Sequence, residues 1–114
     1  MTKEQMREVM VHVFEECMKL RDAGQKEYAH DDNNALANFE RLGKELGQDR
    51  KKILWIYMRK HLDGILAHIN GHTSQREDVA GRINDAIVYL CLLRGMVNEA
   101  SIPTDDLISR RAGV

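Results

Sequence analysis

A short polar stretch between two helical segments holds the densest set of reactive side chains in this sequence. Residues 26–34 read KEYAHDDNN, and Asn38 and Phe39 follow shortly afterwards. An ordinary turn uses Asp and Asn, but this one adds a lysine, a tyrosine and a histidine. Binding residues are common on loops that a rigid scaffold holds in place. A ligand site, if the chain has one, is therefore expected to begin here.

Asp85 is a second candidate, because it lies among apolar neighbours in the sequence. A buried carboxylate is costly unless a partner compensates its charge. Asp78, Arg82, Asp85 and Tyr89 follow one another at steps of four, three and four, which places them on one helix face. Two interpretations are open. Arg82 could pair with Asp78 on a solvated flank, or Asp85 could point into a polar cleft and bind a ligand or metal ion.

Lys60 and His61 lie together in the middle of another helical segment. A cation at this place could neutralise Asp85 or hold a phosphate. The histidine could equally be a structural residue. Four aromatic residues could stack on a base, but aromatic residues in helical segments also serve as core: Tyr28, Phe39, Trp55 and Tyr57.

Oxygen ligands for a metal ion are available on the first helical segment. Glu15 and Glu16 follow His12, and carboxylates of this kind suit Mg²⁺ or Mn²⁺. We name Glu16 and Asp85 as candidate metal ligands and Mg²⁺ as the candidate cofactor; a solvated helix face is the alternative for the first group. The chain has no glycine-rich phosphate loop, HExxH, GxSxG or Cys–His arrangement, so nucleophilic catalysis is disfavoured and enzymatic activity stays open.

Helical segments must position these groups. The 114 residues suit a single domain, and the composition is rich in helix-forming residues. Apolar residues at three- and four-residue steps predict helices over 3–26, 33–46, 49–69 and 74–102, with a short tail over 103–114. We expect an all-α fold in which these segments form an antiparallel four-helix bundle.

Residues suited to capping mark the expected helix starts. Thr2 with Gln5 forms a capping box, and so does the SQRE sequence at 74–77. Asp31 or Asp32 could cap the second helix.

Apolar faces suggest that one chain does not cover all of its own surface. The expected inward positions of the first helix are Met6, Met10, Val13, Cys17 and Leu20, widened by Val9 and Phe14. Those of the third helix are Ile53, Tyr57, Leu62, Ile65, Leu66 and Ile69. A homo-oligomer, most simply a dimer, would bury what remains. Trp55 is either core or part of such an interface.

Charge and composition exclude several classes of protein. There are 17 basic and 18 acidic residues, and residues 50–52 are the only basic run, so binding of nucleic acid is unlikely. The N-terminus has no signal-peptide core, and no apolar run could span a bilayer. Cys17 and Cys91 are expected to be small buried residues in a reducing compartment. We expect a cytoplasmic protein that does not contact a membrane.

The order of these motifs resembles the "nucleotide modification associated domain" proteins, a small all-helical family of phages and bacteria. The resemblance covers roughly residues 20–93. It is carried by Lys26, Tyr28, Asn38, Phe39, Arg59-Lys60-His61, Glu77, Asp85 and Tyr89. The family usually has a glycine after the tyrosine, where this chain has Ala29. The resemblance implies a role in phage or bacterial nucleotide metabolism.

A looser similarity links the chain to the all-helical nucleoside triphosphate pyrophosphatases, which hold magnesium with an ExxE and a later ExxD helix. Asp85 matches the last acid, but Arg82 stands where the glutamate should be. Lys19 follows Glu16 where the first helix would need its second glutamate. A divergent magnesium-dependent pyrophosphatase is therefore the third hypothesis.

The leading hypothesis is a protein that binds a nucleotide or a nucleotide-like phosphate compound at the mouth of the bundle. Lys26 and Lys60 would meet phosphate, Tyr28 or Phe39 the base, and Asn38 would hydrogen-bond. Asp85 would orient a lysine or a metal ion, with His61 and Tyr89 beside it. The rival hypothesis is a non-enzymatic oligomer that binds another protein through exposed Met and Trp side chains.

Overall fold

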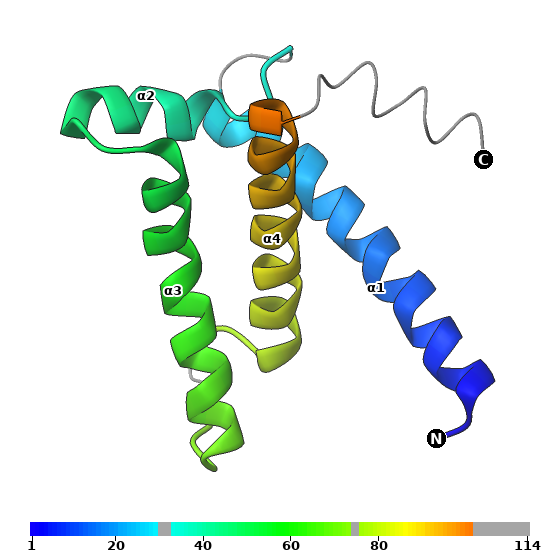
Figure 1. The fold of residues 1–114 in the computed structure, drawn as a ribbon. Coiled ribbons are helices and arrows are strands. Elements are labelled where there is room, and N and C mark those ends of the chain that lie inside the picture. Colours follow the sequence, from blue (N-terminus) through cyan, green and yellow to red (C-terminus); the bar gives the residue numbers. More distant parts are fainter. Residues whose placement is uncertain (30–32, 74–75, 102–114) are drawn as a thin grey trace, which may run out of the picture.

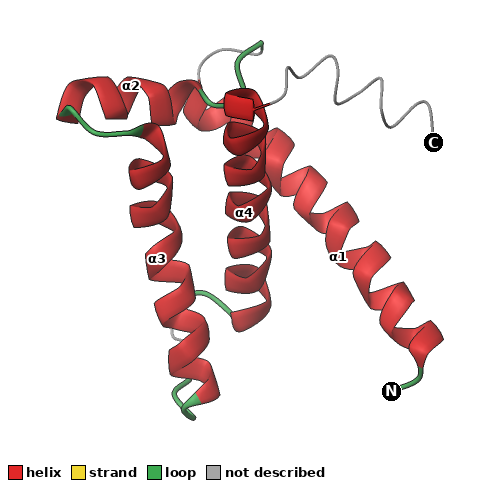
Figure 2. Cartoon of the chain, in the orientation of Figure 1, coloured by secondary structure: helices red, strands yellow, loops and turns green. Residues whose placement is uncertain are grey.

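The fold is all-helical in a computed structural model that describes residues 1–29, 33–73 and 76–101 (Figure 1, Figure 2). Its elements are α1 (Lys3–Gly24), the π-helical turn η1 (Gln25–Ala29), α2 (Ala37–Leu46), α3 (Arg50–Ile69) and α4 (Val79–Ser101). The described residues contain no strand. The predicted all-α class is confirmed. None of the described helices is both long and apolar enough to cross a membrane.

The helices α3 and α4 form the centre of the fold. They run side by side in opposite directions, and α2 lies across the end of this pair (Figure 1). The C-terminal part of α1 packs against α4, whereas its N-terminal part leans away from the pair (Figure 1). One chain thus holds an α3–α4 hairpin with α1 and α2 attached to it.

Two predicted helix starts are confirmed by their caps. Thr2 Oγ1 accepts a hydrogen bond from the Gln5 amide at 3.1 Å, and Gln5 Oε1 accepts one from the Thr2 amide at 2.7 Å. The Asp49 carboxylate accepts from the Lys51 amide at 2.8 Å at the start of α3. Each side chain satisfies an amide that the helix itself leaves without a partner.

The predicted start of α2 was wrong, because the helix begins at Ala37. Asn34 forms a local turn instead: its Oδ1 accepts from the Leu36 amide at 3.0 Å, and its Nδ2 donates to Glu40 at 2.9 Å. Asparagine side chains compete for the backbone in this way and delay a helix. The proposed caps at residues 31–32 lie outside the described residues.

The predicted start of α4 was also wrong. The described residues 76–78 are not helical, and α4 begins at Val79. Asp78 supplies the capping contact, since its Oδ1 accepts from the Gly81 amide at 2.7 Å. Aspartate is among the strongest capping residues. The Glu77 carboxyl is consequently available for another contact, which is with Asp85. Residues 74–75 lie outside the described part.

The end of α1 differs from the prediction of a single helix that runs to Lys26. The α-helix stops at Gly24, and a π-helical turn carries the chain on to Ala29. Arg21 hydrogen-bonds to the Gln25 side chain and to the Ala35 carbonyl, the latter at 2.9 Å. Gln25 Nε2 in turn donates to the Asn34 carbonyl at 3.0 Å. These contacts fasten the polar stretch to the end of α1.

The core lies where α2 meets the hairpin. Its buried members are Leu36, Phe39, Ile53, Leu54 and Met96, with Leu42, Tyr89, Leu92 and Leu93 packed against them. Arg50 links three helices, because its guanidinium lies 3.1 Å from Glu40 and 3.6 Å from Glu99. Gly43 allows the close turn into α3: a Cβ there would lie 2.8 Å from the Gln48 carbonyl oxygen.

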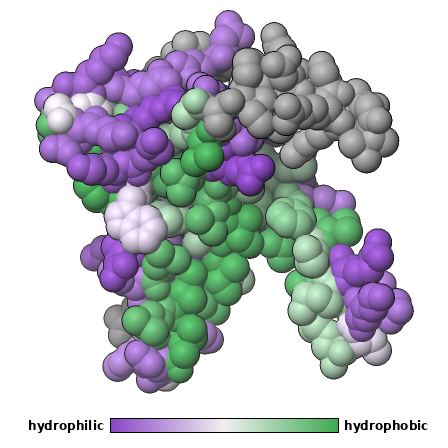
Figure 3. All heavy atoms as spheres, viewed as in Figure 1, coloured by the Kyte–Doolittle hydropathy of each residue, from purple (hydrophilic) through white to green (hydrophobic). Residues whose placement is uncertain are grey.

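Several expected inward positions are exposed in the single chain. On α3, Leu66 and Ile69 are exposed, whereas Leu54, Met58 and His61 are buried. On α1, Cys17 is the one fully buried member of the predicted stripe, and Met6 and Met10 are exposed. Cys91 is exposed as well, contrary to the prediction. Figure 3 shows apolar side chains on the open faces of α3, α4 and α1.

Candidate functional site

A cavity of about 610 Å³ opens between the end of α1, the start of α2 and the middle of the α3–α4 hairpin. We call it the site cavity. The polar and aromatic residues that line it are Glu27, Asn38, Arg41, Tyr57, Lys60, His61, Glu77, Asp85 and Tyr89. The structure therefore brings together five of the predicted site residues: Asn38, Lys60, His61, Asp85 and Tyr89.

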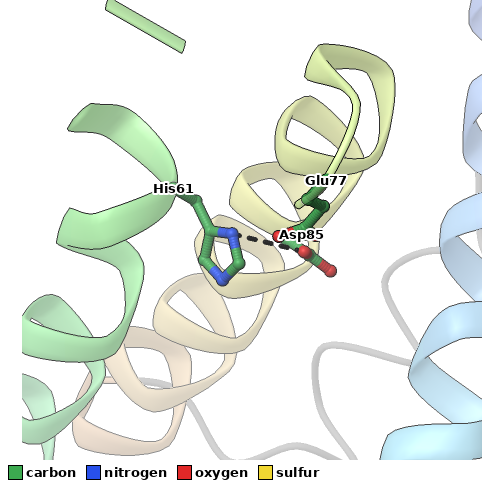
Figure 4. A group of neighbouring side chains, drawn as sticks. All are labelled: His61, Glu77 and Asp85. Carbon is green, nitrogen blue, oxygen red and sulfur yellow. Dashed lines mark ion pairs between the residues drawn. The ribbon is translucent and has the colours of Figure 1, made fainter. Parts of the chain in front are cut away.

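The wall between α3 and α4 carries a histidine and two carboxyl groups (Figure 4). His61 Nδ1 lies 3.3 Å from Asp85 Oδ2. Glu77 reaches the same place from the residues just before α4. One ligating atom from each side chain lies within 4.8 Å of the other two. Among the described residues this is the one group of three or more such side chains.

Burial governs the electrostatics of this wall. Burial, the hydrogen bond with Glu77 and the charge of Glu77 together raise the pKa of Asp85 to about 6, against the opposing charges of Lys60 and Arg82. Burial also lowers the pKa of His61, although the Glu77 charge acts in the other direction. The buried imidazole is therefore neutral at pH 7.

The Arg82 side chain does not pair with the Asp78 carboxylate, as one interpretation of the sequence required; only its backbone amide contacts Asp78, at the carbonyl oxygen. Its side chain lies across α3, where Nη1 donates to the Lys60 carbonyl at 3.3 Å. Gly64 provides the room for this crossing, since a Cβ there would lie 2.5 Å from Arg82 Nε. Asp85 lines the site cavity instead of a solvated flank.

Four rings contact one another in series: Phe39 meets Tyr57 and Tyr89 edge to face, and Tyr89 meets His61 at a tilt. The ring centroids of Phe39 lie 6.2 Å from Tyr57 and 6.3 Å from Tyr89, and the Tyr89 ring lies 5.6 Å from His61. Phe39 is only 3% exposed and belongs to the core, which favours a supporting role over contact with a base. Tyr57 is 38% exposed and lines the site cavity.

The predicted residues of the polar stretch are not all brought to the cavity. Lys26 is exposed on η1 and does not line it, whereas its neighbour Glu27 does. The side chain of Tyr28 and residues 30–32 lie outside the described part of the chain.

The candidate metal ligand Glu16 lies elsewhere. It is 2.8 Å from His12 Nε2 and accepts a hydrogen bond of 2.7 Å from Asn84 Nδ2. Both contacts are on the exposed side of the α1–α4 packing, away from the group around Asp85. The placement gives Glu16 a role in joining two helices.

Four polar or aromatic residues of the cavity were missing from the predicted site residues: Glu27, Arg41, Tyr57 and Glu77. Two of them share a helix face with predicted residues, since Arg41 follows Asn38 by one turn and Tyr57 precedes Lys60 by one turn. That spacing was a usable signal. Glu77 was matched only through the family resemblance, because its sequence context indicated a helix cap.

Comparisons with protein-family models, curated proteins and solved structures give no match to this chain.

Proposed function

We propose that the site cavity binds a nucleotide or a nucleotide-like phosphate compound. The observation that carries this proposal is the combination of two cationic and two aromatic side chains, Arg41, Lys60, Tyr57 and Tyr89, in one cavity of about 610 Å³. Small-molecule sites commonly have volumes of about 300–1,000 Å³ and a few convergent polar groups. Cations hold phosphate through charge-assisted hydrogen bonds, and aromatic faces stack on a base.

Each lining residue has a role in this proposal. Lys60 and Arg41 contact the phosphate, and Tyr57 offers its ring to the base. Asn38 hydrogen-bonds to the base or sugar, because its amide both donates and accepts. Asp85 orients Lys60 or a metal ion. Lys26 precedes the cavity-lining Glu27 and would extend the site at its mouth.

Thermal melting with a panel of nucleotides and deoxynucleotides, with and without Mg²⁺, tests this proposal. A ligand that binds only the folded chain raises the melting temperature by mass action. The shift should disappear in Lys60→Gln and persist in Lys52→Gln, which alters an exposed lysine of the same helix outside the cavity. A flat response across the whole panel would overturn nucleotide binding.

The second part of the proposal is that the chain forms an antiparallel four-helix bundle within an oligomer. Met6, Met10 and Phe14 on α1 are 47%, 50% and 48% exposed. Contiguous apolar surface of this kind marks interaction sites. We infer that a second copy packs against α1 and completes the bundle. Light scattering should give a dimer mass, and Phe14→Glu should give a monomer; a monomeric wild-type chain would refute this part.

The rival function, a module that binds another protein, draws on the same exposed faces. Trp55 and Ile56 on α3 are 50% and 62% exposed. Hydrolysis of triphosphates has less support. Arg82 lies across α3 at the position where the pyrophosphatase pattern needs a glutamate, and Glu16 lies apart from Asp85. The family resemblance implies a role in phage or bacterial nucleotide metabolism, and we propose that this role is cytoplasmic because the N-terminus lacks a signal-peptide core.

A further inference from the structure

We propose that His61, Glu77 and Asp85 bind a divalent transition-metal ion of the Mn²⁺ or Zn²⁺ class in the wall of the site cavity. The proposal concerns the metal alone and does not depend on nucleotide binding. It starts from the meeting of three side chains that come from α3, the residues before α4, and α4 itself (Figure 4).

The distances suit one shared ion. Ligating atoms lie about 2.0–2.2 Å from Zn²⁺, so two ligands of the same ion stand at most about 4.4 Å apart. In the structure the three candidate atoms are all within 4.8 Å of one another. Small side-chain rotations therefore close the group around an ion, with no change in the helices.

His61 provides a second and independent observation. Its side chain is 7% exposed, yet the buried Nδ1 has no hydrogen-bond partner although Asp85 Oδ2 is 3.3 Å away. A protonated Nδ1 in a merely structural histidine would donate to this carboxylate in good geometry. A deprotonated Nδ1 would set its lone pair against the carboxylate oxygen. A cation between the two groups satisfies both, and uncompensated buried polar atoms are uncommon without such a reason.

The donor set selects the kind of metal. Imidazole nitrogen suits Zn²⁺ and similar transition ions, carboxylate oxygen suits Mn²⁺ as well as Mg²⁺, and Mg²⁺ prefers oxygen ligands with several waters. Three protein ligands leave coordination positions open. Because all three side chains also line the site cavity, those positions face the cavity and can take water or a ligand oxygen.

The surrounding charges allow a doubly charged ion. Ionised Glu77 and Asp85 together carry two negative charges. Lys60 and Arg82 are the cations whose charge reaches Asp85. Arg82 is directed at the Lys60 carbonyl, and Lys60 is exposed, so neither occupies the space between the three ligands.

Titration calorimetry with Mn²⁺, Zn²⁺ and Mg²⁺ on the full chain, without nucleotide, tests the proposal. We expect one Mn²⁺ or Zn²⁺ per chain. His61→Gln, Glu77→Gln and Asp85→Asn should each weaken binding at least about tenfold, since even indirect metal partners contribute about that much. His12→Gln is the matched control: His12 also pairs with a carboxylate, Glu16 at 2.8 Å, but lies outside the group. The metal affinity of His12→Gln should equal that of the wild type.

A spectroscopic measurement on the wild-type chain avoids any folding defect of the variants. Electron spin echo modulation of bound Mn²⁺ should show coupling to an imidazole nitrogen, and the coupling should be lost in His61→Gln. Absence of binding, absence of nitrogen coupling, or equal loss in His12→Gln would overturn the site. Nucleotide binding is measured in EDTA, where no metal ion is bound. Its result is therefore independent of the metal site, so failure of one proposal can be told apart from failure of the other.

Discussion

Asp85 on α4 lies 3.3 Å from His61 on α3, and this contact joins the two central helices at the wall of the site cavity. Both side chains are largely buried, at 21% and 7% exposure. These two polar side chains therefore lie between packed helices and also line the site cavity.

The raised pKa of Asp85, about 6, predicts a specific dependence of stability on pH in metal-free protein. The folded state binds a proton more tightly than the unfolded state, so this residue's contribution is fully present below pH 4. It is lost as pH rises through about 6. The change is about 3 kcal/mol. Urea unfolding in EDTA should show that Asp85→Asn removes this decline.

The lowered pKa of His61 acts with the opposite sign. Its contribution is present above the unfolded value and is lost as pH falls. The effect of Asp85 is therefore measured as the difference in the free energy of unfolding between the wild type and Asp85→Asn at each pH. Asp63→Asn is the control, because Asp63 is an exposed aspartate paired with Arg59 on the same helix. A similar pH profile in both variants would contradict the assignment to Asp85.

The sequence predicted the parts of the fold that depend on local contacts. The start of α1 follows from Thr2 and Gln5, and that of α3 from Asp49, because each cap involves neighbours in the chain. The start of α4 was missed because the sequence offers two capping residues, Ser74 and Asp78, and in the structure it is Asp78 that caps the helix.

The residues of the candidate site were predicted where their positions depend on spacing along one helix. Asp85 and Tyr89 share a helix face by spacing, and Lys60 with His61 supplied the opposite side. Glu77 could not be assigned from spacing, because its approach depends on how the chain reverses between α3 and α4. The exposed stripe on α1 was predicted as inward, since periodicity identifies an apolar face and does not say which chain covers it.

The two cysteines should differ in reactivity. Burial raises the pKa of the Cys17 thiol, whose Sγ lies 3.7 Å from the Asn84 carbonyl, whereas Cys91 is exposed. The thiolate is the reactive form, so Cys91 should be alkylated first by iodoacetamide at pH 7.5 and Cys17 only slowly. Peptide mass spectrometry over time measures both rates. Faster labelling of Cys17 would contradict the packing of α1 on α4.

Gly43→Ala should destabilise the chain by about 1–3 kcal/mol, because the new methyl group would press on a backbone atom that cannot turn away. The Cβ would lie 2.8 Å from the Gln48 carbonyl oxygen in the turn between α2 and α3. Gly95→Ala is the control, since a Cβ there meets nothing within 4 Å on α4. That change should stabilise by up to about 1 kcal/mol. Chemical denaturation of both variants makes the comparison.

Gly64→Ala tests the crossing of Arg82 over α3. A Cβ at Gly64 would lie 2.5 Å from the Arg82 Nε and Nη1 atoms, so the guanidinium must leave α3 and give up the Lys60 carbonyl. We expect a loss of about 1–2 kcal/mol in the free energy of unfolding. Arg82→Ala removes the obstructing side chain, so adding Gly64→Ala to it should cost much less than in the wild type. A double-mutant cycle measures this coupling, and strict additivity would show that the two residues do not meet.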